Sequence, residues 1–367
     1  MGFSAIRVYN FRNLENSEIY FPSSKIFFIG NNGQGKTNWM EAIYLLCYGS
    51  SFRIRKESIM INREQEDAMV KGILVSLPEY ERTVSVHLKR KGIKEIKIDS
   101  KNIKDRKELL QNIPAVIFSH NDLYFITGSP ASKRRFFNQT LCMFDIGFIN
   151  LLRKYKKVVI HRNKMLKQNH LDLLDIYNMK MVEYGLEIQK KRKEIIKLYN
   201  NTFCDLFNKI SGIKGYMEIR YKPVWGDYDS KTRILDILKK NLIKDIRFRT
   251  STLGPHRDNF NYFLEGRDFA QIASTGQVRL ISIILRVAQA QFFFEVTGKK
   301  PILLVDDVLL EIDQKKRETI INYLPPYEQA FFTFLPDEDF RFYESNDTVK
   351  YHVLNGKVRP WKEQEIY

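Results

Sequence analysis

The chain has 367 residues, 44% hydrophobic and 28% charged, which suits a soluble protein of two or three domains, or one large core with an inserted lobe. Its three cysteines, Cys47, Cys142 and Cys204, are far apart and odd in number, which argues against disulfides or a zinc site and fits a reducing cytoplasm. The net charge of +17 favours polyanionic partners such as nucleic acid, although Lys-rich usage from AT-rich coding DNA would give the same excess.

Along the chain, residues 6–11, 19–21 and 25–29 predict short strands, the last of them buried. A glycine-rich turn follows, and then a helix over 38–48 that ends at Gly49. Residues 68–98 predict antiparallel strands, because Val84, Val86 and Leu88 alternate with polar residues before a turn at Lys91 and Gly92. A further short strand is expected at 116–118.

From about residue 132 to 210 the pattern changes to long helices. Residues 151–200 hold 13 Lys and Arg against 5 Asp and Glu. Two interpretations stay open: the solvated face of a helical hairpin, or a helical arm that touches a phosphate backbone. Core-like segments return after about residue 249: a helix over 277–296 that Gly298 ends, and buried strands at 301–305 and 330–334. No stretch approaches the apolar run of about 18 residues that a membrane helix needs, so we expect no membrane partner.

The glycine-rich turn matches the P-loop pattern GxxxxGK[ST], with the required strand before it and helix after it. Backbone N–H groups of such a turn cradle phosphate oxygens, and the helix N-terminus adds favourable partial charge. Lys36 would reach the β and γ phosphates of ATP, and Thr37 would hold Mg²⁺. The predicted nucleotide-binding residues are Gly30, Asn31, Asn32, Gly33, Gln34, Gly35, Lys36, Thr37 and Asn38.

Two carboxylates follow the strand at 301–305, in the manner of a Walker B motif. Asp306 is the candidate Mg²⁺ partner, on the side opposite Thr37. Asp307 would orient or deprotonate the attacking water, so Asp307 and Lys36 are the predicted catalytic residues. An apolar run that ends in Asp is common by itself, but together with the P-loop it is a strong indication of a Walker B motif.

A third element, ASTGQ at 273–277, lies directly before the long helix and about 30 residues ahead of Asp306. It has the form and place of an ABC-type signature, in which Ser274, Gly276, Gln277 and the helix N-terminus make a second anion site. In ABC-type ATPases this site closes on the nucleotide of a second subunit. The alternative interpretation is an ordinary Ser/Thr cap of the helix.

The chain resembles the RecF family of bacterial DNA-repair proteins over nearly its whole length. The matching segments are LGPHRD at 253–258, GSP at 128–130 with KRRF at 133–136, FS at 118–119 with DL at 122–123, SFR at 51–53, and DDVL at 306–309 with Glu311 and Asp313. The departures from the family pattern are His120, Asn138, Asn259, Thr275 and Leu310. Thr275 and Leu310 lie in elements expected at a dimer interface, and Thr333 stands near where the family's switch histidine should fall.

The resemblance implies an α/β fold, an ABC-type P-loop ATPase head with an inserted helical lobe. We expect head segments at 1–131 and 250–367 and the lobe at 132–249. It further implies a cytoplasmic protein that dimerises on ATP and hydrolyses ATP weakly with stimulation by DNA. Such a protein would bind duplex DNA near single-strand gaps or junctions without sequence specificity, and would assist RecA loading with RecR.

Four other classes of protein are alternatives to a RecF-like protein. The distance from Lys36 to Ser274 is too short for the coiled coil of an SMC or Rad50-like protein. Thr275 and the GPHRD segment argue against a transporter subunit, and the signature segment against a small-molecule kinase. A DNA-binding ATP-switch clamp with vestigial hydrolysis stays open, and single-turnover hydrolysis with DNA would separate it.

Overall fold

The computed structural model describes residues 1–54, 56–76, 80–227, 230–310 and 312–362. They form two compact units, Met1–Asp122 with Leu285–Tyr367, and Leu123–Ile284. Residues 250–284, which the sequence analysis assigns to the head, thus group with the second unit. The expected division by function into head and lobe stays a prediction.

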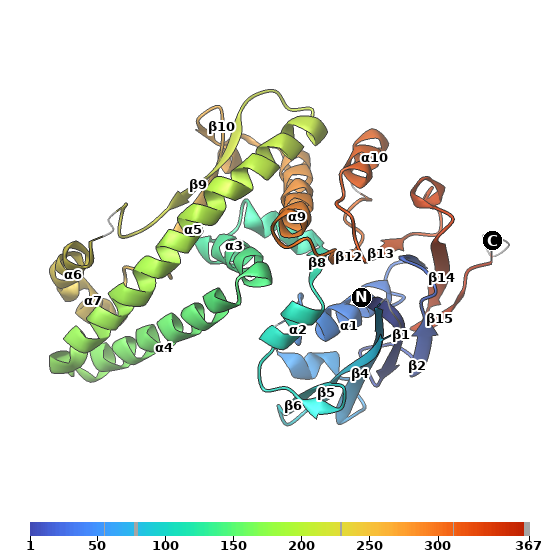
Figure 1. Cartoon of the computed structure of the whole chain (residues 1–367), viewed down its shortest axis with the longest axis horizontal. Helices are drawn as coiled ribbons and strands as arrows, with labels where there is room; N and C mark the ends of the chain where they lie inside the picture. The colour runs from blue at the N-terminus through green and yellow to red at the C-terminus, as the bar shows by residue number, and fades with distance from the viewer. Residues whose placement is uncertain (55, 77–79, 228–229, 311, 363–367) are drawn as a thin grey trace. The chain divides into compact units, whose positions relative to one another are not determined.

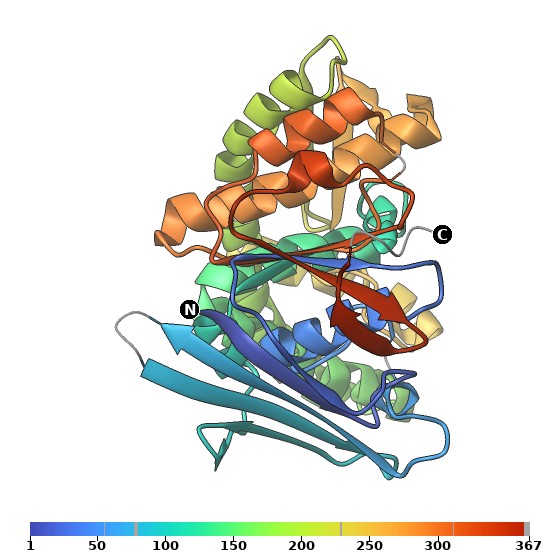
Figure 2. The same cartoon turned by 90° about the vertical axis from the view of Figure 1, so that its right-hand side faces the viewer.

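One sheet of the first unit is antiparallel and built from the first 102 residues (Figures 1 and 2). Its order is β2-β1-β4-β5-β6-β7. Alternate side chains of β5, including Val84, Val86 and Leu88, are buried, as the period-two pattern predicts. The strands are β1 (Gly2–Tyr9), β2 (Ser17–Tyr20), β4 (Asp67–Ser76), β5 (Tyr80–Lys89), β6 (Lys94–Ile98) and β7 (Lys101–Asn102).

The other sheet of this unit has the order β15-β14-β3-β13-β12-β8 and is parallel except for its terminal hairpin. Strand β3 lies between β13 and β14, which come from the last 40 residues of the chain. The strands are β3 (Lys25–Ile29), β8 (Ala115–Phe118), β12 (Ile302–Val305), β13 (Gln329–Phe334), β14 (Thr348–Leu354) and β15 (Lys357–Pro360). Strands β8, β12 and β13 are buried throughout, which is usual for a parallel sheet.

Helix α1 (Lys36–Tyr48) contacts strands of both sheets, β4 and β5 of one and β8 and β13 of the other. Ten of its thirteen residues are buried, as expected of a helix that is apolar on most of its surface. Gly49 ends it in a left-handed conformation, as predicted. The remaining short elements of this unit are η1 (Glu57–Met60), α2 (Lys107–Asn112), α10 (Gln314–Asn322) and η4 (Arg341–Tyr343); η2 (His120–Phe125) crosses its boundary.

The second unit contains the predicted long helices (Figure 1). It also contains a small antiparallel sheet, β11-β10-β9, in which β9 (Met217–Lys222) pairs with β10 (Asn259–Leu264). Residues 132–249, predicted as a helical lobe, therefore include a strand whose partner comes from beyond residue 249. The other elements are α3 (Pro130–Phe144), α4 (Ile146–Gln168), η3 (Leu171–Leu173), α5 (Leu174–Ile210), α6 (Lys231–Lys240), α7 (Leu242–Phe248), β11 (Arg267–Asp268) and α8 (Phe269–Ile272).

Helix α9 (Thr275–Thr297) begins in the second unit and ends in the first. It is long and apolar enough to cross a membrane, but 72% of its most apolar window is buried inside the protein. Its Arg286 is also buried, and the guanidinium makes two hydrogen bonds to Asp122, of 2.7 and 3.0 Å. This is the behaviour of a core helix.

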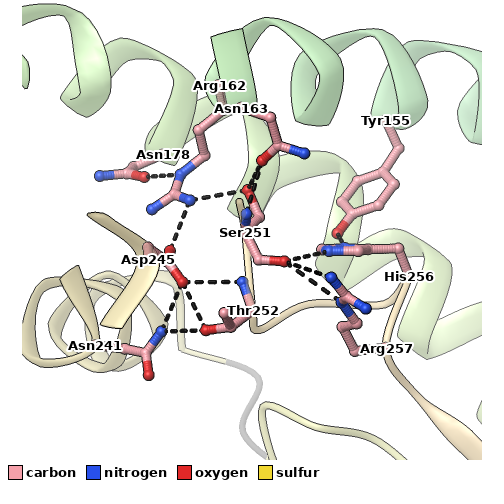
Figure 3. A network of polar contacts seen from close by, with 10 residues as sticks. All are labelled: Tyr155, Arg162, Asn163, Asn178, Asn241, Asp245, Ser251, Thr252, His256 and Arg257. Atoms are coloured by element: carbon pink, nitrogen blue, oxygen red, sulfur yellow. Dashed lines mark hydrogen bonds and ion pairs between the residues drawn. The ribbon is translucent and has the colours of Figure 1, made fainter. Parts of the chain in front are cut away.

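A buried polar network joins α4 and α7 to the segment 251–257 (Figure 3). Arg162 and Asp245 are both fully buried and form an ion pair, with 2.7 Å between Nη1 and Oδ2. The same Nη1 donates to Ser251 Oγ at 2.8 Å. His256 Nε2 lies 3.0 Å from the carbonyl oxygen of Ser251. A carbonyl oxygen only accepts, so Nε2 carries the proton, and in the neutral imidazole Nδ1 accepts from the Tyr155 hydroxyl at 2.8 Å.

The environment of His256 gives a testable pH dependence. Burial lowers its pKa from 6.5 to about 4. Between these values the unfolded chain binds a proton that the folded chain does not, so stability falls as the pH falls from 6.5 towards 4, and no such loss occurs above 6.5. We expect His256→Gln to lose less stability across this window than the wild type, by at most about 1.4 kcal/mol per pH unit. Urea unfolding at pH 7.5, 6 and 5 checks this, and equal pH slopes for the two proteins would contradict it.

A second buried pair, Arg192 and Asp258, holds the end of the GPHRD segment. Arg192 Nη1 lies 2.9 Å from Asp258 Oδ2 and donates to the carbonyl oxygen of Pro255 at 2.7 Å. Its Nε and Nη2 donate to Asn138 Oδ1, and the Val224 N–H donates to Asp258 Oδ1 at 2.8 Å. Asn138, one of the departures from the family pattern, thus accepts hydrogen bonds from the arginine without adding a second carboxylate. These hydrogen bonds hold Pro255 and Asp258 of the GPHRD segment in place within the second unit.

Candidate functional site

The P-loop runs from the end of β3 into α1, where the sequence predicts it. Gly35 caps α1 with a φ of 118°, a conformation that favours glycine. Asn31, Asn32 and Gly33 are exposed, whereas the Lys36 side chain is buried and folded back onto the loop. Its Nζ donates to the carbonyl oxygen of Gly30 at 2.6 Å. The ammonium group thus lies inside the curve of the loop, where a phosphate oxygen would replace the Gly30 carbonyl oxygen as its acceptor.

The carboxylate after β12 meets the hydroxyl at the start of α1. Thr37 Oγ1 donates to Asp306 Oδ1 at 2.9 Å, although 269 residues separate them in the chain. Burial, with a contribution from Asp307, raises the pKa of Asp306 to about 7. A hydroxyl and a carboxylate are the hard oxygen ligands that Mg²⁺ takes, and one or two protein ligands beside substrate phosphates are usual for it. Among the described residues, no group of three or more His, Cys, Asp or Glu side chains could hold a metal.

Asp307 is held in a strained position beside the P-loop. Its φ of 51° is uncommon for a residue with a side chain. Its backbone N–H donates to Thr333 Oγ1 at 2.8 Å, and the Thr333 hydroxyl donates to Asp307 Oδ1 at 2.6 Å. The other carboxylate oxygen lies 4.0 Å from Lys36 Nζ. Thr333 stands near where the family's switch histidine is expected, and its two hydrogen bonds fix Asp307.

The P-loop lines a small polar cavity of about 220 Å³. Its lining residues are Asn31, Asn32, Gly33, Gly35, Lys36, Thr37, Asn38, Arg53 and Asp307. A neighbouring cavity of about 760 Å³ shares Asn38 and Arg53 with it and includes Arg12, Lys56, Arg63 and Arg90. Seven of the nine residues predicted as the nucleotide-binding P-loop thus come together at the smaller cavity, and Gly30 and Gln34 do not line it.

Two arginines beside these cavities were not predicted as site residues. The buried carboxylate of Glu41, on α1, lies 2.8 Å from Arg12 Nε and 3.8 Å from Arg53 Nη1. Arg53 also donates to Asn38 Oδ1 at 2.9 Å. Arg53 is thereby fixed at the P-loop cavity, and Arg12 at the larger cavity that adjoins it. The sequence signal was weak, since Arg53 appeared only as part of the SFR segment and Arg12 in no motif.

The outer side of the P-loop is held by the tip of the β14–β15 hairpin. The Gly356 N–H donates to the carbonyl oxygen of Gln34 at 2.8 Å, and the Asn355 N–H donates to Gln34 Oε1 at 2.6 Å. Gly356 has a φ of 79°, and a Cβ there would lie 2.0 Å from the carbonyl oxygen of Asn13. Only glycine fits this position. The Gln34 side chain, predicted to bind nucleotide, is used for this contact.

The signature segment begins α9 in the second unit. The Gln277 N–H donates to Ser274 Oγ at 3.3 Å and the Ser274 N–H donates to Gln277 Oε1 at 2.9 Å, a reciprocal capping box. Ser274, Thr275 and Gly276 are nevertheless exposed. Ser274 and Gln277 thus cap the helix, the outer side of the segment is exposed to solvent, and the expected second anion site stays a prediction. Leu310 is half-buried, and Glu311 lies outside the described residues.

The fold is the α/β fold of the ABC-type ATPase head. A solved structure of an SMC head bound to the C-terminal winged-helix domain of ScpA has a TM-score of 0.55 at 14% identity, covering 100% of this chain and 99% of that chain, which shows the fold alone. Residues 3–352 match the family described as RecF/RecN/SMC N terminal domain.

More specific relatives are similar over nearly the full length. The chain is 39% identical to the DNA replication and repair protein RecF of Treponema pallidum, over 95% of this chain and 98% of that protein. The corresponding protein of Leptospira interrogans is 33% identical, over 97% and 99%. The structure of the recombination mediator protein RecF-ATP in the RecFOR pathway matches with a TM-score of 0.90 and 30% identity, covering 98% of this chain and 97% of that chain. The chain belongs to the RecF family of DNA replication and repair proteins.

Proposed function

We propose that the protein is an ATP-controlled DNA-binding protein of recombinational repair, with ATP held at the P-loop. The observation that carries this is the contact between Thr37 and Asp306 beside the buried ammonium group of Lys36. The 220 Å³ cavity suits phosphate groups, whereas the adjoining 760 Å³ cavity has room for the nucleoside. Arg53, which lines both, would lie along the phosphate chain.

Slow hydrolysis would follow from the same residues. Thr37 and Asp306 would hold Mg²⁺, which when bound with ATP neutralises phosphate charge. Asp307, fixed by Thr333, would orient or deprotonate the attacking water. We expect a weak ATPase that DNA stimulates, since ATP serves mainly as a switch. Lys36 would stabilise charge on the β and γ phosphates.

A second copy of the chain would complete the site. Ser274 and Gly276 are exposed at the start of α9, and Gln277 joins them in the capping box. The Gly276 N–H, the Ser274 hydroxyl hydrogen and the Gln277 side-chain amide would approach the γ-phosphate bound to the partner subunit. ATP would then drive dimerisation, and hydrolysis would release it.

The proposal that DNA is a partner rests on the charge of the protein and on its family. Helix α4 contains no Asp or Glu, and Lys156, Lys157, Lys164 and Lys167 are exposed on it, an arrangement that suits a phosphate backbone without sequence readout. We further propose that the protein acts in the cytoplasm on duplex DNA near single-strand gaps or junctions, where it assists RecA loading with RecR; the relative named for the RecFOR pathway supports a role in recombination.

Sedimentation with and without ATP and duplex DNA tests this proposal. We expect ATP to convert the wild type from monomer to dimer, and both Lys36→Ala and Ser274→Arg to stay monomeric. Ser274→Arg should still bind ATP, because Ser274 serves the partner's nucleotide. Lys91→Ala, which changes an exposed lysine in a turn, is the matched control and should dimerise. A wild type that binds ATP and DNA but stays monomeric would overturn the two-subunit site.

A further inference from the structure

The larger cavity beside the P-loop has a charge that a nucleoside does not explain. Cations outnumber acids among its lining residues, which include Arg12, Arg53, Lys56, Arg63, Arg90 and Glu64. A base and a ribose are uncharged at neutral pH, so they need hydrogen bonds and apolar contacts rather than cations. The excess of positive charge therefore indicates a ligand that brings an anionic group to this cavity in addition to its 5′-phosphates.

Three of the arginines are already held by partners within the protein. Arg12 Nε lies 2.8 Å from the Glu41 carboxylate, and Arg53 Nη1 lies 3.8 Å from it. The Arg90 guanidinium donates three hydrogen bonds of 2.5–2.6 Å to backbone carbonyl oxygens within residues 62–65. Arg12 and Arg90 thus serve mainly to build the cavity.

The charges of Lys56 and Arg63 are left for a ligand. Both side chains are exposed, and among the described residues neither has an ion pair with a carboxylate. Glu64, which lines the cavity with them, is also exposed and offsets one charge only. A guanidinium binds a phosphate group through two parallel hydrogen bonds, and an ammonium group binds it as a point charge.

The wall of the cavity that carries Arg63 is held in place. The Arg12 guanidinium donates to the carbonyl oxygen of Ile59 at 3.0 Å, and the Arg12 N–H donates to that of Met60 at 2.8 Å. The bonds from Arg90 fix the residues that follow. A wall ordered in this way loses little further entropy when a ligand binds.

The cavity continues from the one at the P-loop, because Asn38 and Arg53 line both. When the 5′-phosphates of a nucleotide lie at the P-loop, the ribose enters the larger cavity with its 2′ and 3′ oxygens. A phosphate group on either oxygen would be the second anionic group, within one small molecule.

We propose that this cavity binds nucleotides that carry a further phosphate on the ribose 2′ or 3′ oxygen, with that phosphate on Lys56 and Arg63, and that such nucleotides compete with ATP. The proposal rests on the ATP site proposed above and adds a regulatory ligand to it. A DNA backbone would also use the two cations, but it would not need the P-loop.

Displacement of a fluorescent ATP analogue from the full chain with Mg²⁺ tests this, with ATP and its 2′-phosphate and 3′-phosphate derivatives as competitors. One derivative should bind the wild type about 10-fold more tightly than ATP. The charge variant, Lys56→Gln with Arg63→Gln, should bring this affinity ratio close to one. Lys101→Gln with Lys104→Gln, which changes exposed lysines of the same unit, should keep the wild-type ratio.

A second variant and a second probe show where the ligand binds. Lys36→Ala should weaken ATP and the tighter derivative alike, since both place their 5′-phosphates at the P-loop. Fluorescence anisotropy with a labelled DNA duplex measures whether the charge variant loses affinity for DNA instead.

The outcomes separate the two proposals. If the wild type does not bind ATP, the proposed ATP site itself fails. If it binds ATP and neither derivative binds more tightly, or if the charge variant keeps the ratio, the cavity is not a site for a ribose phosphate. A derivative that binds Lys36→Ala as it binds the wild type lies elsewhere on the protein. A charge variant that loses only duplex affinity would assign the two cations to DNA and would also overturn the proposal.

Discussion

Asp307→Asn is expected to slow ATP hydrolysis by at least about 100-fold while ATP affinity stays within about threefold. The asparagine keeps the shape of the side chain and an oxygen that accepts from the Thr333 hydroxyl, which lies 2.6 Å away in the wild type. It removes only the negative charge and the ability to take a proton from water. Binding should persist, because the phosphate contacts proposed for Lys36 and the P-loop backbone do not involve Asp307.

Single-turnover hydrolysis with DNA and equilibrium binding of a fluorescent ATP analogue check this expectation. Asp337→Asn, which changes an exposed carboxylate of the same unit, is the control and should match the wild type. A variant that hydrolyses ATP as the wild type does would remove Asp307 from the mechanism. If the wild type itself hydrolyses no ATP with DNA present, the protein is the ATP-switch clamp with vestigial hydrolysis.

Arg192→Met should lower the free energy of unfolding of the second unit by about 3–5 kcal/mol, because it leaves the Asp258 carboxylate buried without its cation. The exposed fractions of the two side chains are 2% and 0%, so water cannot compensate. The methionine keeps much of the aliphatic volume, which limits the cavity. The loss should therefore come from charge and from the hydrogen bonds to Pro255 and Asn138.

Urea unfolding measures this effect, with Lys190→Met as the matched control on the exposed side of α5, where a change within about 0.5 kcal/mol is expected. Adding Asp258→Asn to Arg192→Met should recover part of the loss, since the unpaired charge is then gone. If the single variant unfolds at the wild-type urea concentration, the buried pair does not stabilise the second unit.

The elements of the nucleotide site could be predicted because they are local in sequence. A buried strand, a glycine turn and a helix lie within residues 25–48, and the two aspartates directly follow a second apolar strand. Parallel strands bring such ends to one edge of a sheet, so the meeting of Thr37 with Asp306 follows from the pattern. The strand pairing of β9 with β10 was not visible, since their partner residues lie 37 or more positions apart and neither strand has a turn signal that joins it to the other.

The contacts of single polar side chains also could not be predicted from the sequence. Nothing in the residues near Thr333 indicates that its hydroxyl bonds to a carboxylate 26 positions earlier. Gln34 lies inside a phosphate-binding motif, yet its side chain contacts a hairpin that begins more than 300 residues later.

The placement of β3 between β13 and β14 has a consequence for synthesis of the chain. The antiparallel sheet needs only the first 102 residues, whereas both neighbours of β3 and the hairpin tip that holds Gln34 come from residues 329–356 and emerge from the ribosome much later. Contacts between such distant segments form late in folding. A nascent chain that stops before residue 329 therefore contains Lys36 and Thr37 but lacks the sheet that shapes their loop, so we expect the ability to bind nucleotide to arise only after residues 329–356 have been synthesised.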